Sequence, residues 1–499
     1  MTETSLTRFN ELHVVSDIHM GGRPPGFQIL REGKRLASFI RWVGQQRPDG
    51  HVGLVLNGDV IDSLAEDIGG YVAADQAETM MTRIFNDQSF VPIWDALRDF
   101  VGKAGRSLVI VMGNHDIELA LPAVQRMIEN RLAGDDAAAR GRIFFSTEGA
   151  GYSCLVGQAR VFCIHGNEED SWNVIDYDAL FELARNRNAG LPFDPGSWQP
   201  NAGTMMVKDV MNEIKHKFAW IDLLKPETKA AVGVLAVLDP GQLGKISRTI
   251  PIFWEKLRGT LRIYGLLSAD ETSVMDPAAV QSIALDQLLG PNLLEGLQTG
   301  QIAGVKSADD MLLEAEKNFA KPRAQGPRKD ETLGWGQLVW DRLTGVDKPE
   351  ALRRALKDWL RGDKTFDIKD RDETFEAVTA KVGTGVDFII TGHTHLERAI
   401  EMDARRCYFN CGTWIRLLRF TKDVLDQLEV FRKVYDVLMD GSMEAIDKAE
   451  VKPSQPFVMN QTSAVAIRTD GDAVVGELVH VEGEDPVSRE VISRVPRRS

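Results

Sequence analysis

Cysteine is scarce in this chain, with four residues among 499: Cys154, Cys163, Cys407 and Cys411. They form no Cys-x-x-Cys pair, so a cysteine-based metal site is not indicated. All four lie in or near apolar stretches that we interpret as strands. We therefore expect buried, reduced thiols in a cytoplasmic protein.

Long apolar runs are also missing. The longest covers residues 230–238, far short of the ~18–20 residues that a membrane-spanning helix needs. Residues 1–10 are polar, and only a few apolar residues follow before Asp17, so no signal peptide is predicted. We expect no transmembrane segment and, at most, contact with a membrane surface.

Basic residues are not in excess. The 59 lysines and arginines face 73 aspartates and glutamates, which gives a net charge of −14 and a pI near 5.3. This balance disfavours nucleic acid as a partner held by counterion release, although it does not exclude a nuclease. The length is ample for a buried core and exceeds one ordinary domain.

Histidine is rare as well, with nine residues, but five of them fall in four of five short motifs that each follow an apolar run. Open α/β sheets place their ligands at the carboxyl ends of strands, which is where these motifs are expected to lie. The motifs are Asp17-Ile18-His19 after residues 12–15, Asn57-Gly58-Asp59 after 52–56, Gly113-Asn114-His115-Asp116 after 108–112, His165-Gly166-Asn167 after 161–164, and Gly392-His393-Thr394-His395 after 388–391.

This mixture of side chains predicts a metal site. Imidazole nitrogens together with carboxylate and amide oxygens suit borderline divalent ions better than calcium, and one carboxylate can bridge two ions about 3.5–4 Å apart. Turn chemistry alone would explain the glycines and aspartates but not five histidines. His13, His51, His216 and His480 lie outside the motifs and remain unassigned.

Taken together, the motifs resemble the calcineurin-like metallophosphoesterase family over much of residues 11–171 and 386–416. The resemblance implies an α/β fold, a four-layer sandwich of two packed mixed β-sheets flanked by helices. It also implies two divalent transition metal ions, with manganese favoured over iron, zinc, cobalt or nickel. Carried over by position, the first ion would be held by Asp17, His19 and His395, the second by Asn114, His165 and His393, and both by Asp59.

Three further residues concern the chemistry beside the ions. His115 matches the family histidine that approaches the leaving-group oxygen, and we expect Asp116 to orient it. Asp62 could support the metal ligands by a hydrogen bond or cap the following helix, and we prefer the cap. With these residues, two ions would activate a bridging hydroxide for in-line attack on phosphorus.

The organisation along the chain predicts a divided catalytic core. Residues 1–171 alternate strand and helix patterns, and residues 376–485 complete the core, with a helical excursion over 421–450. Residues 172–375 read as a helical insertion that contains seven of the ten tryptophans and a breaker-rich linker at 321–329. The insertion could act as a substrate cap, a membrane contact or an oligomer interface. Residues 486–499 are polar and expected to form a flexible tail.

The predicted substrate is a small or lipid-linked phosphodiester or phosphomonoester. Residues 58–62 lack the arginine that follows the Gly-Asp motif of phosphoprotein phosphatases. A second hypothesis is a hydrolase similar to UDP-diacylglucosamine pyrophosphatases, although His115 stands where those enzymes carry arginine. A nuclease is a third hypothesis, and a catalytically silent scaffold is a fourth. A scaffold would be expected to have lost some of the metal ligands. The sequence leaves the oligomeric state open.

Overall fold

The computed structural model describes residues 6–194, 198–225, 234, 238, 347–449 and 457–497. The chain divides into two compact units. The first unit consists of residues 1–204, 364–416 and 460–499, and the second of residues 205–363 and 417–459. Residues 239–346 of the predicted insertion, including the linker at 321–329, lie outside the described residues.

A seven-stranded sheet carries the amino-terminal motifs of the first unit. Four of its strands are parallel neighbours, and a hairpin and an edge strand extend the sheet beside β2. In order across the sheet the strands are β16 (Ser488–Pro496), β15 (Ala473–Glu482), β14 (Ser463–Asp470), β2 (Glu11–Val15), β3 (Val52–Asn57), β4 (Arg106–Val111) and β5 (Ile143–Ser146).

A six-stranded sheet carries the remaining motifs. Its order is β1 (Arg8–Phe9), β6 (Tyr152–Val156), β7 (Ala159–Cys163), β9 (Phe388–Thr391), β11 (Cys407–Cys411) and β10 (Glu397–Glu401). β7 and β9 are parallel neighbours, although more than two hundred residues separate them in sequence. The His165 and His393 motifs therefore follow adjacent strands at the same edge of this sheet.

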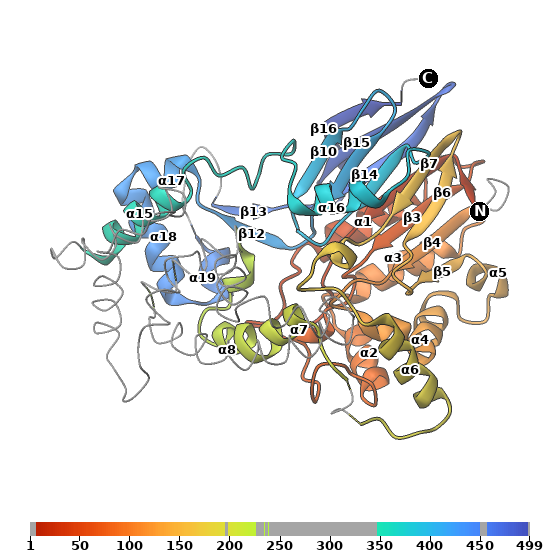
Figure 1. Ribbon diagram of the computed structural model, residues 1–499, viewed down its shortest axis with the longest axis horizontal. Helices are drawn as coiled ribbons and strands as arrows, with labels where there is room; N and C mark the ends of the chain where they lie inside the picture. The colour runs from red at the N-terminus through yellow and green to blue at the C-terminus, as the bar shows by residue number, and fades with distance from the viewer. Residues whose placement is uncertain are drawn as a thin grey trace, which may run out of the picture. The chain divides into compact units, whose positions relative to one another are not determined.

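Side chains that alternate along the strands divide the core into layers. Val55 of β3 packs between the two sheets with Phe388 and the four cysteines, whereas Leu54 and Leu56 face the helices. α16 (Glu373–Lys381) covers the outer side of the six-stranded sheet (Figure 1). Its Phe375 packs with strand residues there. The predicted sandwich of two mixed sheets flanked by helices is confirmed. The four cysteines are free and buried, as expected.

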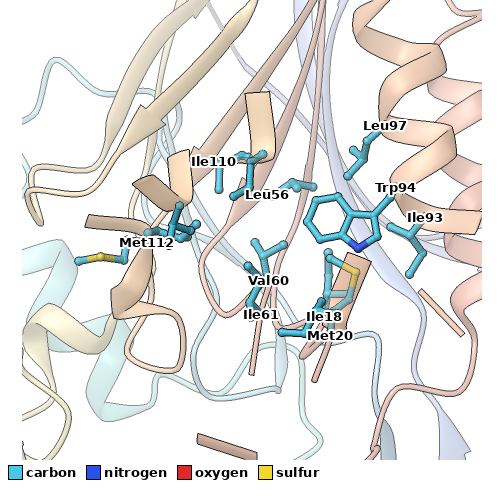
Figure 2. Packing of buried hydrophobic residues seen from close by; sticks show 14 of the residues in the cluster. Ile18, Met20, Leu56, Val60, Ile61, Ile93, Trp94, Leu97, Ile110 and Met112 are labelled. Carbon is cyan, nitrogen blue, oxygen red and sulfur yellow. The ribbon is translucent and has the colours of Figure 1, made fainter. Parts of the chain in front are cut away.

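The helices that cover the seven-stranded sheet have amphipathic sequences, and each turns its apolar side to this sheet or to a neighbouring helix. Figure 2 shows the contact of one of them: Trp94 packs against residues from the strand ends, including Ile18 and Met20. In the first unit the helices besides α16 are α1 (Gly33–Val43), α2 (Ala77–Asn86), α3 (Val91–Val101), α4 (Pro122–Ala133), α5 (Ala137–Arg140) and α6 (Tyr177–Asn188), with 3-10 turns η2 (Ser63–Ala65), η3 (Ile117–Ala120) and η4 (Asn167–Glu169). α7 (Ala202–Met206) runs across the boundary between the units.

The second unit is mainly helical in its described part. Trp220 is buried there and donates a hydrogen bond from its indole nitrogen to the carbonyl of Leu438, 3.1 Å away. The elements are the π-helical turn η6 (Val207–Met211), α8 (Asn212–Lys215), η7 (Ile221–Leu223), α15 (Lys348–Trp359), α17 (Lys422–Asp426), α18 (Leu428–Asp440) and α19 (Met443–Asp447), with a small sheet of β13 (Val458–Asn460), β12 (Arg416–Arg419) and β8 (Leu224–Lys225). Among the described residues, no helix is long and apolar enough to cross a membrane.

The carboxyl-terminal segment differs from its prediction. Residues 486–499 were expected to be a flexible tail, but Ser488–Pro496 forms β16, which pairs antiparallel with β15. Backbone hydrogen bonds hold this edge strand irrespective of its polar side chains, and Val495 reaches the core between the sheets. The prediction of a flexible tail was wrong because an exposed edge strand can have as many polar side chains as a loop.

Candidate metal centre

The segments after β2 and β3 are held together in register beyond the ends of the strands. The backbone nitrogens of Ile18 and His19 each donate to the carbonyl of Asp59, both at 2.9 Å. Because side chains alternate along this segment, Ile18 enters the core while Asp17 and His19 project to the other side. The first two motifs are thereby fixed against each other.

Strained backbone marks the same positions. Six non-glycine residues of the described chain have positive φ, and five of them are motif residues: Asp17, His19, Asp59, His393 and His395, with φ between 50° and 70°. Left-handed backbone is unfavourable for these side chains and persists where the surroundings enforce it, which is common at functional sites. The sixth such residue is Arg47.

Two glycines are required by close approach to these side chains. A Cβ atom on Gly58 would lie 2.2 Å from Nδ1 of His165, and one on Gly113 would lie 2.2 Å from Oδ1 of Asp59. Any larger residue would displace a candidate ligand. The glycines of the Gly-Asp and Gly-Asn-His-Asp motifs therefore make room for the site.

Three groups of side chains among the described residues have metal-binding potential, and two of them share Asp59. Of these two, the first contains Asp17, His19, Asp59 and His395, and the second contains Asp59, His165 and His393. The third group consists of His19, Asp62 and His115. The two groups that share Asp59 contain six of the seven ligands that the resemblance implies. Asn114 is 4% exposed and follows Gly113, the glycine that closely approaches Asp59.

The distances within the clusters bring the candidate ligand atoms close together. Nε2 of His19 lies 3.1 Å from Nε2 of His395, near enough for both nitrogens to face one cation or for one ring to donate a hydrogen bond to the other. Nε2 of His165 lies 3.2 Å from Oδ2 of Asp59, while its Nδ1 lies 2.8 Å from the carbonyl of Asn57, to which it can donate. This bond leaves Nε2 as the ligating nitrogen. Among the described residues, Nε2 of His165 and Oδ1 of Asn114 are buried without a hydrogen-bond partner.

The electrostatics of the site also favour a cation. Burial by itself raises the pKa of Asp59, but His165, His115 and His19 hold this pKa well below its usual value. Burial lowers the pKa of His165, yet Asp59 and Asp17 raise it to about 10. A group of buried carboxylates that attracts a proton so strongly would attract a metal ion in the same way.

The surroundings of His115 correct one expectation. Nδ1 of His115 lies 3.0 Å from Oδ1 of Asp62, so Asp62 orients the ring, not Asp116 as predicted. The Asp62 carboxylate also accepts from the backbone nitrogen of Ala65, which confirms the predicted cap. One side chain therefore both supports a site residue and caps a turn.

Asp116 instead holds the backbone of two motifs. Its carboxylate accepts from the nitrogens of Val60 and Gly113, both at 2.7 Å. Burial and the nearby Asp59 raise the pKa of Asp116 to about 7. It was predicted as a catalytic partner because it is adjacent to His115 in sequence, but the turn directs the two side chains to different neighbours.

Asn410 in β11 and Thr413 in the turn after it support the backbone of two motifs. Asn410 donates from Nδ2 to the carbonyl of Gly392 at 2.7 Å, and Thr413 donates from Oγ1 to the carbonyl of Asp17 at 2.8 Å. The resemblance covers residues 386–416, but the sequence indicated no role for either side chain. Their hydrogen bonds tie the last motif to the first.

Fold and site together indicate a metallophosphoesterase domain in part of the chain. Residues 12–217 match the family model of calcineurin-like phosphoesterases. The chain therefore contains a calcineurin-like phosphoesterase domain, and its His/Asp clusters are consistent with a binuclear metal site of a phosphoester hydrolase. His393 and His395 lie beyond the matched residues, and the structure brings them to the site through β9. No curated protein and no solved structure was found to match the chain.

Proposed function

We propose that the protein hydrolyses a small or lipid-linked phosphodiester or phosphomonoester with two divalent transition metal ions, manganese first among them. The observation that carries this proposal is the pair of His/Asp clusters sharing Asp59. When bound, such ions would activate water for in-line attack and offset charge on the phosphoryl oxygens. Asp17, His19 and His395 would hold one ion, Asn114, His165 and His393 the other, and Asp59 both.

His115 supplies the remaining chemistry. Its side chain is 20% exposed, whereas those of His19 and His165 are almost fully buried, so its ring can reach a bound substrate. Asp62 accepts from Nδ1, so in the protonated ring the remaining N–H, at Nε2, can donate a proton or a hydrogen bond to the departing oxygen. Asp116 stabilises the turn from which His115 projects.

The organisation of the chain supports a substrate-selecting role for residues 172–375, which depart shortly after His165 and return before His393. We propose that this insertion contributes binding to the part of the substrate remote from phosphorus. Residues 172–204 of this insertion belong to the first unit. We further propose a cytoplasmic location, because all four cysteines are free and buried.

An assay with an aryl phosphodiester and the matching monoester tests the proposal. Full-length protein loaded with manganese should hydrolyse at least one of them, and a chelator should abolish the activity. Asp59→Asn should lose activity on both. Metal-loaded protein that turns over neither ester would contradict the proposal and favour a scaffold. Cleavage of single-stranded or duplex DNA instead would favour a nuclease.

A further inference from the structure

Asp170 and Asn173 lie shortly after the His165 motif and belong to none of the five motifs. Nε2 of His393 lies 2.9 Å from Oδ2 of Asp170. Nδ2 of Asn114 donates to Oδ1 of Asn173 at 3.4 Å. Two side chains of one turn therefore each contact a residue that would hold the same ion.

The turn itself is tightly fixed. Asn173 donates from Nδ2 to Oδ2 of Asp170 at 2.6 Å, and its backbone nitrogen donates to the Asp170 carbonyl at 3.0 Å. Asn167 and Asn201 each donate from Nδ2 to the carbonyl of Asn173 at 3.1 Å. A Cβ atom on Gly203 would lie 1.9 Å from Oδ1 of Asn173, so the backbone packs closely over this side chain.

Each contact determines which atom of the ligand faces the ion. Because Asp170 engages Nε2 of His393, Nδ1 is the nitrogen left for ligation, and the carboxylate makes the ring a stronger donor. Because Nδ2 of Asn114 donates to Asn173, the amide oxygen points elsewhere. This oxygen is buried without a hydrogen-bond partner among the described residues, as an atom reserved for a cation would be.

We propose that Asp170 and Asn173 are positioning residues that orient His393 and Asn114 and so set the affinity of the second metal site. Neither contacts Asp17, His19 or His395 in any described hydrogen bond, so the first site should be unaffected. The inference rests on the proposed function, because it requires a binuclear centre. Residues that orient metal ligands typically contribute about 10–100-fold to affinity.

The test is a manganese titration of the full-length apoprotein. Calorimetry measures the affinity of each ion, and electron paramagnetic resonance shows whether the bound ions are coupled. Wild-type protein should bind two ions and show the signal of a spin-coupled pair. In Asp170→Ala and Asn173→Ala, one of the two ions should bind about 10–100-fold more weakly. At one equivalent of manganese these variants should show the six-line signal of an isolated ion, and excess manganese should restore the coupled signal.

Two further variants serve as comparisons. Asp170→Asn keeps an oxygen that can accept from His393 and should lose less affinity than Asp170→Ala. Glu169→Gln removes the adjacent carboxylate, which pairs with Lys381 rather than with a ligand, and should leave both affinities unchanged. If circular dichroism shows that Asp170→Ala is unfolded, the manganese affinities of Asn173→Ala and Asp170→Asn are compared with those of the wild type instead.

Unchanged affinities in the Asp170 and Asn173 variants would overturn the inference. Equal weakening of both ions with a lower melting temperature would also overturn it, since that result indicates general destabilisation. Wild-type protein that binds fewer than two ions would contradict the proposed centre and this inference together. Wild-type protein that binds two ions but hydrolyses no phosphoester would contradict only the proposed function, and the variant affinities would still decide the role of the turn.

Discussion

His115 has the most exposed side chain of the five motif histidines, at 20% against 13% for His395 and 11% for His393, and its Nδ1 lies 3.0 Å from Oδ1 of Asp62. If it assists the leaving group, His115→Ala should keep both metal ions and lose about 10²–10⁴-fold in kcat on an alkyl phosphodiester. The loss should be smaller on a nitrophenyl ester, because nitrophenolate needs little protonation. Steady-state kinetics with both esters, together with metal analysis, measure this. Equal losses on the two esters would mean that His115 positions the substrate instead.

Asp62 should act through His115. Asp62→Ala removes the acceptor at Nδ1 of His115, so the variant should again lose more activity on the poor leaving group than on the good one. It also removes the cap at Ala65, which typically costs about 0.5–2 kcal/mol of stability. Kinetics of Asp62→Ala and of the Asp62→Ala/His115→Ala double variant separate the effect through His115 from the effect of losing the cap. Additive losses in the double variant would show that the two residues act independently.

Glu11 and His13 link stability to pH at the other end of β2, where Nε2 of His13 lies 2.8 Å from Oε1 of Glu11. Complete burial lowers the pKa of His13 from 6.5. Burial raises the pKa of Glu11, but His13 and Arg47 together lower it from 4.5 to about 2. Both groups bind protons more weakly in the folded chain, so stability should fall as pH drops, below 6.5 through His13 and below 4.5 through Glu11.

Denaturant unfolding at pH 7, 6 and 5 measures this dependence. His13→Gln should show a shallower fall than wild type, by at most about 1.4 kcal/mol per pH unit, which corresponds to one proton. A rise in wild-type stability toward pH 5 would mean that Glu11 keeps His13 charged in the folded protein.

The sequence could predict the motif residues because each lies within a few positions of a strand end. It could not predict which residues support them. Asp62 contacts His115 across 53 positions, and Asp170 contacts His393 across 223. Such partners are selected by the packing of two sheets, and sequence adjacency pointed to Asp116 instead. The positive φ of the ligands is likewise a property of the assembled loops.

At the scale of elements, the loop after β4 approaches the shared carboxylate of Asp59 closely at Gly113. Gly113→Ala would place a methyl group 2.2 Å from Oδ1 and 2.6 Å from the backbone nitrogen of Asp59, so the bridging carboxylate must move. We expect this variant to fold with weakened binding of both ions. Gly385→Ala, with no atom within 4 Å of the new Cβ, is the matched control. Metal analysis after dialysis provides the readout, and equal metal content in the two variants would refute the close-approach argument.

The strands before the five motifs could be predicted from short apolar runs, and β9 has the expected bounds. The error at β16 has a physical origin. An edge strand needs only one partner, so its backbone bonds to β15 stabilise it while most of its side chains remain polar and exposed. Pairing of this kind depends on the neighbouring strand and cannot be seen in the local sequence.

At the scale of the whole molecule, the second unit can be separated from the proposed chemistry. Replacing residues 205–363 and 417–459 by Gly-Ser linkers removes this unit and leaves every candidate ligand in place. Metal content and turnover of a small aryl phosphoester should be kept, while kcat/KM for a lipid-linked phosphoester should fall, because remote binding energy is lost. A folded, metal-loaded truncation with the same preference as the full chain would exclude a selecting role for this unit.

The central claim is a binuclear centre bridged by Asp59, and metal stoichiometry tests it most directly. Purified full-length protein, reconstituted with manganese and freed of excess metal, should contain two ions per chain. Asp59→Asn should weaken both, because this carboxylate is shared by the two clusters. One tightly bound ion in the wild-type protein, or an Asp59→Asn variant with full metal content and full activity, would contradict the account.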